Sequence, residues 1–375
     1  MLTRAKNRSA IEAAVASTSD LSLHPVYLDL PEAARRWKHG RRGLHAYYLI
    51  WQALAWRTAR RLHQTVGFDV AHHLTFAVDW MPAGVAWVRD LPLVWGPVGG
   101  TTGVPWRLWR WLGWRGVIEE GLREVETRLA RRCFGDATAR RAAIVVCQNR
   151  DVAERFRFSR DLVVEPNVAL TLPVPTRVVA SRPSPATRTA VFVGRLIPLK
   201  GLRLAIAALS AHGGADWVLD VYGDGPEEKP GRDLARRLDV ERRVRFHGQR
   251  PREDVLAAVA DADAMLFPGM HDAAGWAVGE AVALGCPVVC LDRGGPPIII
   301  AAAQGSIAVQ ADRRVVGRLA AALEACHSHA VPSDRWNADR LPALLAEWYE
   351  RAACPESVSA QAAPASQVGD AHADD

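Results

Sequence analysis

The stretch Ala190-Val-Phe-Val-Gly-Arg-Leu-Ile-Pro-Leu-Lys-Gly201 decides which fold the sequence predicts. Val191 to Val193 suit a strand buried in a parallel sheet, and apolar residues recur at helical spacing from Leu202 to Leu209. The segment therefore reads as a strand, a loop and a helix. The loop carries two cations, Arg195 and Lys200, at the carboxyl end of the strand, where open α/β sheets bind their ligands. A doubly charged leaving group would suit this loop, and two solvated surface cations are the alternative.

A second motif, His271-Asp-Ala-Ala-Gly-Trp-Ala-Val-Gly-Glu280, weakens that alternative. It holds two acids, Asp272 and Glu280, with seven residues between them. Gly275 opens the helix that carries Glu280, and another apolar strand follows this helix. Strands and helices alternate regularly through this half of the chain, which is typical of a doubly wound parallel sheet.

Together the two motifs resemble the retaining glycosyltransferases of family 4, also called glycosyl transferases group 1. The resemblance covers roughly residues 66–350 and is specific within 190–296. It implies the GT-B fold, in which two Rossmann-like α/β domains, each a doubly wound parallel sheet, face a cleft. It also implies a hexosyltransferase-type enzyme that moves a sugar from a nucleotide sugar to an acceptor and retains the anomeric configuration.

The resemblance also assigns roles to residues around the donor. Asp272 takes the place of the family's first glutamate, which lies near the transferred sugar, and is one methylene shorter. Glu280 is similar to the second glutamate, which accepts hydrogen bonds from the ribose hydroxyls; a glutamate on the helix surface is the alternative. The family's Gly-Phe between them is replaced by Ala273-Ala274, which marks a divergent branch. The donor-binding positions implied are Gly194, Arg195, Lys200, His247, Gly248, Gly275, Trp276 and Glu280.

Cleavage of a sugar–nucleotide bond leaves a diphosphate whose growing charge must be stabilised. The two loop cations and the helix N-terminus at Gly275 and Trp276 offer fixed positive charge, because a helix N-terminus carries about half an elementary charge. Asp261-Ala-Asp263 precedes a predicted strand and reads as the end of a helix rather than a metal site. We therefore expect no metal and no cofactor besides a UDP-linked, GDP-linked or similar donor substrate.

Two histidines end the predicted strand Phe68-Asp-Val-Ala-His-His73. Family members carry a functional histidine after a similar Asp-Val pair, so the resemblance makes His72 or His73 a catalytic candidate close to the sugar. The sequence does not choose between them. The alternative is a histidine that is bonded to the backbone at the domain edge.

The sequence predicts an ordered series of domains. Residues 1–168 form an amino-terminal, acceptor-side domain, and its first strand and glycine-rich loop are expected to be missing, either through a start codon assigned too far downstream or through true abridgement. Residues 169–189 read as a linker and 190–335 as the domain that binds the nucleotide sugar. Residues 336–353 are expected to pack back on the first domain as a terminal helix, and 354–375 to be a disordered tail.

Composition narrows the protein's class and partners. The 375 residues, 49% of them hydrophobic, can supply two cores. No secretory signal and no long apolar run occur in the sequence, and the six scattered cysteines are typical of reduced thiols, so we expect a cytoplasmic location. A net charge of +6 favours anionic partners, while no nucleic-acid-binding signature accompanies it.

The segment Pro105-Trp-Arg-Leu-Trp-Arg-Trp-Leu-Gly-Trp-Arg115 interleaves four tryptophans with three arginines. Such a segment suits the interface of an anionic membrane, which would make the protein peripheral on the inner face of that membrane. The alternative is a helix pair packed on the domain with its arginines outward. The acceptor stays open as a sugar, a lipid or another small molecule.

Two other functions compete with glycosyl transfer. A nucleotide-sugar epimerase of GT-B fold would share the donor site and need no acceptor, but the spacing of Asp272 and Glu280 argues against it. A non-catalytic protein that binds sugar nucleotides is favoured by the missing acceptor loop and by aspartate at position 272.

Overall fold

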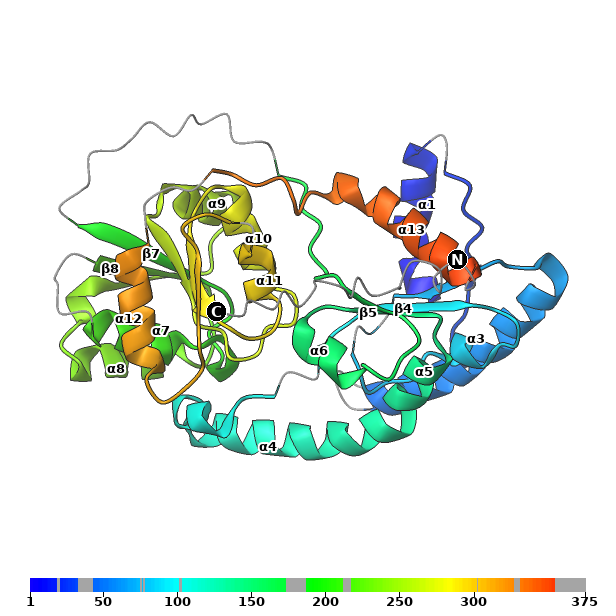
Figure 1. Cartoon of the computed structure of the whole chain (residues 1–375), viewed down its shortest axis with the longest axis horizontal. Coiled ribbons are helices and arrows are strands. Elements are labelled where there is room, and N and C mark those ends of the chain that lie inside the picture. Colours follow the sequence, from blue (N-terminus) through cyan, green and yellow to red (C-terminus); the bar gives the residue numbers. More distant parts are fainter. Residues whose placement is uncertain are drawn as a thin grey trace, which may run out of the picture.

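The computed structural model describes residues 1–18, 21–32, 43–74, 76, 78–100, 103–172, 187–211, 217–301, 303–326 and 331–354. Among these residues, the strands form three parallel sheets of six, four and two strands. Figure 1 shows the six-stranded and the four-stranded sheet in separate halves of the molecule. The tail expected to be disordered and most of the expected linker lie outside the described residues.

The six-stranded sheet forms the second domain, and its strands run in the order β12-β11-β10-β7-β8-β9 with all neighbours parallel. Chain order reverses between β7 and β10, and the carboxyl ends of these two strands form the topological switch point where such sheets bind ligands. The doubly wound sheet predicted for this half is therefore confirmed. Its strands are β7 (Arg188–Val193), β8 (Trp217–Tyr222), β9 (Val244–Gly248), β10 (Ala264–Phe267), β11 (Val288–Leu291) and β12 (Ile307–Val309).

Helices cover both faces of this sheet. Side chains alternate along β7, so Phe192 belongs to one core and Val191 to the other. Leucines of α7 and α12 pack in the core of Phe192, whereas α9, α10 and α11 supply residues to the core of Val191. The helices are α7 (Leu202–Ala211), α8 (Glu228–Arg237), α9 (Arg252–Asp261), α10 (Trp276–Ala283), α11 (Pro296–Ile300) and α12 (Val315–Ala325).

The first domain is built on the four-stranded sheet, whose order β3-β4-β5-β6 follows the chain. Buried apolar residues of β4 and β5 form its centre, and β1 pairs with β2 in a small sheet of its own. The strands are β1 (Leu2–Thr3), β2 (Val26–Tyr27), β3 (Ala71–His73), β4 (Leu93–Val98), β5 (Ile144–Cys147) and β6 (Leu162–Val164). The helices are α1 (Arg8–Ser17), α3 (Leu44–Val66), α4 (Gly113–Ala130), α5 (Asp136–Arg141) and α6 (Arg150–Arg155).

The carboxyl-terminal helix α13 (Leu341–Ala353) lies on the first sheet (Figure 1). Trp348 and Ala352 are buried against Val94 of β4 and Val146 of β5. Arg351 also forms an ion pair with Asp161, its Nη2 atom lying 2.6 Å from Oδ2. The chain thus returns from the second domain to the first. None of the described helices is both long and apolar enough to span a bilayer.

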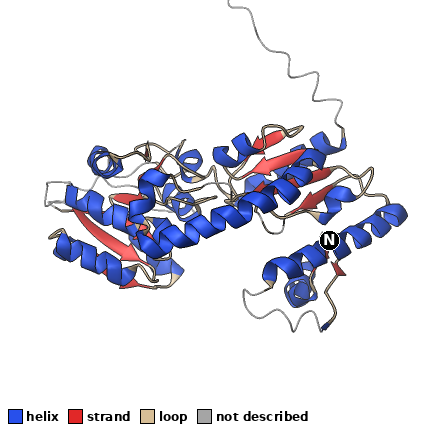
Figure 2. Ribbon diagram, turned by 90° about the horizontal axis from the view of Figure 1, so that it is seen from below, coloured by secondary structure: helices blue, strands red, loops and turns tan. Residues whose placement is uncertain are grey.

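Helix α4 joins the two domains, as Figure 2 shows from below. A 3-10 helix, Trp106–Trp111, leads into it, and Leu108 and Leu112 are buried in the core of the second domain. At its other end α4 continues into a π-helical turn, Arg131–Gly135, that packs on the first domain. In the tryptophan-rich segment the two leucines are therefore packed in a core, as the alternative of a packed helix expects. Trp106, Trp109 and Trp114 are exposed.

Candidate functional site

Three loops meet at the carboxyl ends of β7, β8 and β10. Gly223, directly after β8, has φ +126°, and a Cβ atom there would lie 2.0 Å from the carbonyl oxygen of Gly194. Gly201 has φ +77°, and its Cβ atom would lie 2.2 Å from the carbonyl oxygen of Pro268. Glycine is therefore needed at both positions, since only glycine lets these loops pack backbone to backbone.

The two loop cations have different surroundings. Lys200 is largely buried, and its ammonium forms an ion pair with Oδ2 of Asp272 above the ring of Phe267. Arg195 is exposed, and no described residue holds its guanidinium. Lys200 is thus fixed by an ion pair, and Arg195 is exposed to solvent.

Asp272 is bonded through both of its carboxylate oxygens. While Oδ2 pairs with Lys200, Oδ1 accepts a hydrogen bond of 2.8 Å from the backbone N–H of Gly275. Gly275 has φ +81° and caps the start of α10, whose first residue, Trp276, is 45% exposed. Sequence reasoning placed these residues in one site, and the structure brings them into direct contact.

Glu280 lies in the second turn of α10 and has a partner that the sequence did not indicate. Its Oε1 atom accepts hydrogen bonds from Nε and Nη2 of Arg252, at 3.0 and 2.7 Å. Arg252 begins α9, so the end of one helix supplies a cation to the neighbouring helix. The Glu280 side chain is 17% exposed, and both of these hydrogen bonds leave its second oxygen, Oε2, without a donor among the described residues.

His247 lies at the end of β9 and is held by two residues of β8. Its Nε2 atom is 2.8 Å from Oδ1 of Asp220, and its ring stacks on Tyr222 with centroids 4.5 Å apart. Asp220 and Tyr222 share one face of the strand because side chains alternate. Their separation by two residues in a predicted strand could have indicated that both face the same neighbouring strand. Gly248, with φ +68°, follows directly and has open space beside it.

The two histidines of β3 point to opposite sides of the first sheet. His72 lies with Nε2 3.0 Å from the carbonyl oxygen of Gly96 and with Nδ1 2.8 Å from the hydroxyl of Tyr349 in α13. Burial lowers the pKa of His72, so the neutral ring donates from Nε2 and accepts at Nδ1. His73 lies with Nε2 3.1 Å from the hydroxyl of Tyr48.

The loop that precedes α10, residues 271–275, and the loop that follows β11, residues 292–295, contact the first domain. Asn149 donates a hydrogen bond of 3.1 Å from Nδ2 to the carbonyl oxygen of Ala273. Arg293 donates one of 2.9 Å from Nη2 to the carbonyl oxygen of Gly103. A Cβ atom on Gly99 would lie 2.9 Å from that of Ala273, so the glycine turn after β4 is in close contact with the loop that precedes α10. Asp272 therefore stands where the two domains meet.

Comparison with known proteins agrees with this architecture. Residues 180–328 match the family model of glycosyl transferases group 1. The chain is 34% identical over 131 residues to the D-inositol 3-phosphate glycosyltransferase of Corynebacterium glutamicum (strain R). This alignment covers 33% of this chain and 31% of that protein. It is 29% identical over 177 residues to the 2-deoxystreptamine glucosyltransferase of Streptomyces kanamyceticus, 46% of each chain. The alignments thus span less than half the length of these relatives.

Solved structures share the whole fold at low identity. The crystal structure of WaaG, a glycosyltransferase involved in lipopolysaccharide biosynthesis, has a TM-score of 0.54 at 17% identity and covers 93% of this chain and 99% of that one. The structure of Anabaena Alr3699/HepE in complex with UDP has a TM-score of 0.52 at 17% identity, and the match covers 80% of this chain and 82% of that one. The chain has the GT-B fold, and its residues 180–328 match the glycosyl transferases group 1 family.

Proposed function

We propose that the protein is a glycosyltransferase that moves a sugar from a nucleotide sugar to an acceptor hydroxyl, with retention and without a metal ion. One observation carries the proposal. Lys200, Asp272 and the start of α10 come together at the switch point of a domain that matches the group 1 family. This is the place where an α/β sheet of this kind binds its ligand.

In this proposal the donor diphosphate lies between the cationic loop and α10. Lys200, Arg195 and the first backbone amides of α10 stabilise the charge that develops on the leaving diphosphate. The free Oε2 of Glu280 accepts ribose hydroxyls, and His247-Gly248 borders the base. The UDP and UDP-glucose complexes of Anabaena HepE, which shares the fold, support a UDP-linked donor.

The sugar lies between Asp272 and the first domain. We propose that Asp272 acts through its contact with the sugar hydroxyls, and that the departing phosphate takes the proton of the attacking acceptor on the same face. The proposal retains both His72, held by Gly96 and Tyr349, and His73, held by Tyr48, as candidates near the sugar.

Product analysis with a panel of UDP- and GDP-sugars tests the reaction, in the presence of cell extract as the source of acceptors. We expect a glycosylated product whose anomeric configuration matches that of the donor, and full turnover in excess EDTA, because the positive charge comes from side chains and a helix end. If the product is the epimerised donor, the protein is a nucleotide-sugar epimerase and not a transferase. Nucleotide binding without any product would indicate a non-catalytic protein, and turnover restored only by added Mg²⁺ or Mn²⁺ would contradict the metal-free part.

We also propose that the protein works at the cytoplasmic face of a membrane, which it touches through the tryptophan-rich segment and the outer side of α4. Trp114, Ile118, Leu122, Val125 and Leu129 lie along one side of α4, each between 53% and 74% exposed. Exposed Trp106 and Trp109 and three exposed arginines extend this surface toward the second domain. Indoles suit head-group depth, and each cation near an anionic surface contributes about 1 kcal/mol.

Flotation with anionic and zwitterionic liposomes tests the contact. We expect the protein to float with anionic liposomes at low salt and to release at high salt, because salt screens exposed charges. The variant Arg107→Gln/Arg110→Gln/Arg115→Gln should lose most of this binding. A matched variant with the same charge loss on α3, Arg57→Gln/Arg60→Gln/Arg61→Gln, should keep it. If wild type stays in the soluble fraction, or both variants behave alike, the membrane contact is excluded.

A further inference from the structure

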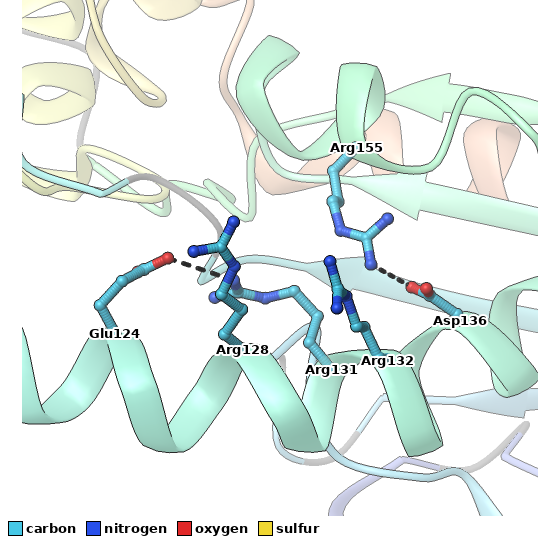
Figure 3. A pocket seen from close by; sticks show the side chains of 6 residues that line it. All are labelled: Glu124, Arg128, Arg131, Arg132, Asp136 and Arg155. Atoms are coloured by element: carbon cyan, nitrogen blue, oxygen red, sulfur yellow. Dashed lines mark hydrogen bonds and ion pairs between the residues drawn. The ribbon is translucent and has the colours of Figure 1, made fainter.

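A hollow lies in the first domain, between α6 and the junction of α4 with the π-helical turn. It is a cavity of about 410 Å³. Figure 3 shows Arg128, Arg131 and Arg132 projecting from this junction toward Arg155, which comes from α6 on the opposite side. Glu124 and Asp136 complete the lining. The lining carries four arginines and two acids, and Asp79 beside Arg131 leaves a formal excess of one positive charge, which favours an anion.

The four arginines differ in how they are held. Arg131 is buried, and its Nε atom lies 2.6 Å from Oδ2 of Asp79, while Arg155 pairs with Asp136. These two guanidinium groups are fixed by acids of the first domain. Arg128 and Arg132 are exposed toward the hollow, and no described residue forms an ion pair or a side-chain hydrogen bond with either. Two guanidinium groups are therefore available to an anion, and each offers the planar fork that binds phosphate through two bonds.

The backbone keeps the free arginines together. Arg128 and Arg132 stand four residues apart, where side chains of a helix are neighbours and like charges destabilise it in the absence of an anion. The π-helical turn Arg131–Gly135 begins between them, and such turns occur frequently at functional sites. A Cβ atom on Gly135 would lie 1.9 Å from the carbonyl oxygen of Asp79, so the turn is packed directly on the first domain.

The hollow is connected to the interdomain site through Asp79. The backbone N–H of Asp79 donates a hydrogen bond of 2.8 Å to the carbonyl oxygen of Gly99, and Gly99 contacts Ala273 beside Asp272. Arg123, further along α4, lies with Nη2 3.5 Å from Nδ1 of His271 on the other side of the same boundary. The hollow thus belongs to the first domain, across the boundary from the domain that carries Asp272.

We propose that the arginine pocket, formed by Arg128, Arg131, Arg132 and Arg155, binds a phosphate group of the acceptor. The proposal rests on the glycosyltransferase function above and adds the chemical class of its acceptor, a phosphate ester that carries a free hydroxyl. Arg128 and Arg132 bind the phosphate oxygens, Arg131 and Arg155 form the fixed base, and the hydroxyl of the same molecule attacks the donor sugar held beside Asp272. A soluble sugar or polyol phosphate and a phospholipid head group share this chemistry.

Calorimetry with glycerol 3-phosphate at constant ionic strength tests the pocket. We expect saturable binding to wild type that is at least tenfold weaker in Arg128→Gln/Arg132→Gln. The control variant is Arg57→Gln/Arg61→Gln, which removes the same charge from exposed positions four residues apart on α3. Its affinity for glycerol 3-phosphate should differ less than twofold from that of wild type. Vesicles of phosphatidylcholine with phosphatidic acid form a second arm. Binding of glycerol 3-phosphate identifies a soluble source, and saturable binding to the vesicles alone, with the same dependence on the pair, identifies a lipid.

Absence of saturable binding in both arms, or equal loss in the two double variants, would overturn the pocket. Titration of UDP into the same samples reports the donor site separately. A pocket variant that binds UDP as wild type does shows that only the phosphate site has changed. Absence of UDP binding in wild type contradicts the proposed function whatever glycerol 3-phosphate does. If the double variant fails to fold, phenylglyoxal modification of wild type decides: phosphate should protect Arg128 and Arg132 and leave Arg57 and Arg61 reactive.

Discussion

Replacing Lys200 with methionine is expected to lower the rate of sugar transfer by about 10²- to 10³-fold, the effect of removing one fixed group that stabilises developing charge. Methionine keeps most of the side chain's length and removes its charge. Lys200 is only 20% exposed, so water replaces the lost cation poorly. Single-turnover kinetics with saturating donor measure the change.

Two further variants make this result specific. Lys229→Met removes an exposed lysine from α8 of the same domain, and transfer should stay at the wild-type rate. Lys200→Met also leaves Asp272 without its cation, which can destabilise the fold. Adding Asp272→Asn should restore the melting temperature of Lys200→Met and leave transfer slow. If Lys200→Met transfers sugar at the rate of wild type, the diphosphate lies elsewhere.

Gly223→Ala is expected to lower the free energy of unfolding by about 3 kcal/mol or more. Its φ of +126° is nearly restricted to glycine, and the new Cβ atom would lie 2.0 Å from the carbonyl oxygen of Gly194, which must then move. Because Gly194 precedes the cationic loop, nucleotide affinity should fall as well. Urea unfolding measures the first effect, and calorimetry with UDP the second.

Gly67→Ala separates the clash from the backbone strain. Gly67 ends α3 with φ +72°, and a Cβ atom there has nothing within 4 Å. This variant should lose only about 1–2 kcal/mol, the cost of the left-handed conformation for a residue with a Cβ atom. Equal losses in the two variants would mean that the loop after β8 adjusts freely to the added methyl group.

Much of the second domain follows from local pattern. Its strands are short apolar runs that end in glycine, and regular alternation with helices leaves a doubly wound parallel sheet as the natural arrangement. The sequence also placed Lys200, Asp272 and Gly275 in one site, because each follows the carboxyl end of a strand. It treated Arg195 and Lys200 as an equivalent pair. The structure separates them, since the turn at Pro198 directs one inward to Asp272 and leaves the other exposed.

The residues that sequence reasoning missed depend on contacts between distant segments. Arg252 reaches Glu280 from another helix, and no local pattern connects them. Helix α4 is the clearest case. The apolar series from Trp114 to Leu129 has the spacing of a core face, yet this side is exposed, while Glu120, Thr127 and Arg131 are buried. Its polar side faces the junction of the domains, which periodicity alone does not reveal.

Helix α4 also limits how the two domains can move. Burial of Leu108 and Leu112 contributes about 1.5–3 kcal/mol each, so the start of the helix travels with the second domain. Arg131, paired with Asp79, keeps its other end on the first. Gly121 lies between these anchors, and a Cβ atom there would touch nothing within 4 Å. A change in the angle between the domains must therefore bend α4. We expect the bend at Gly121, because glycine restrains the helix backbone least.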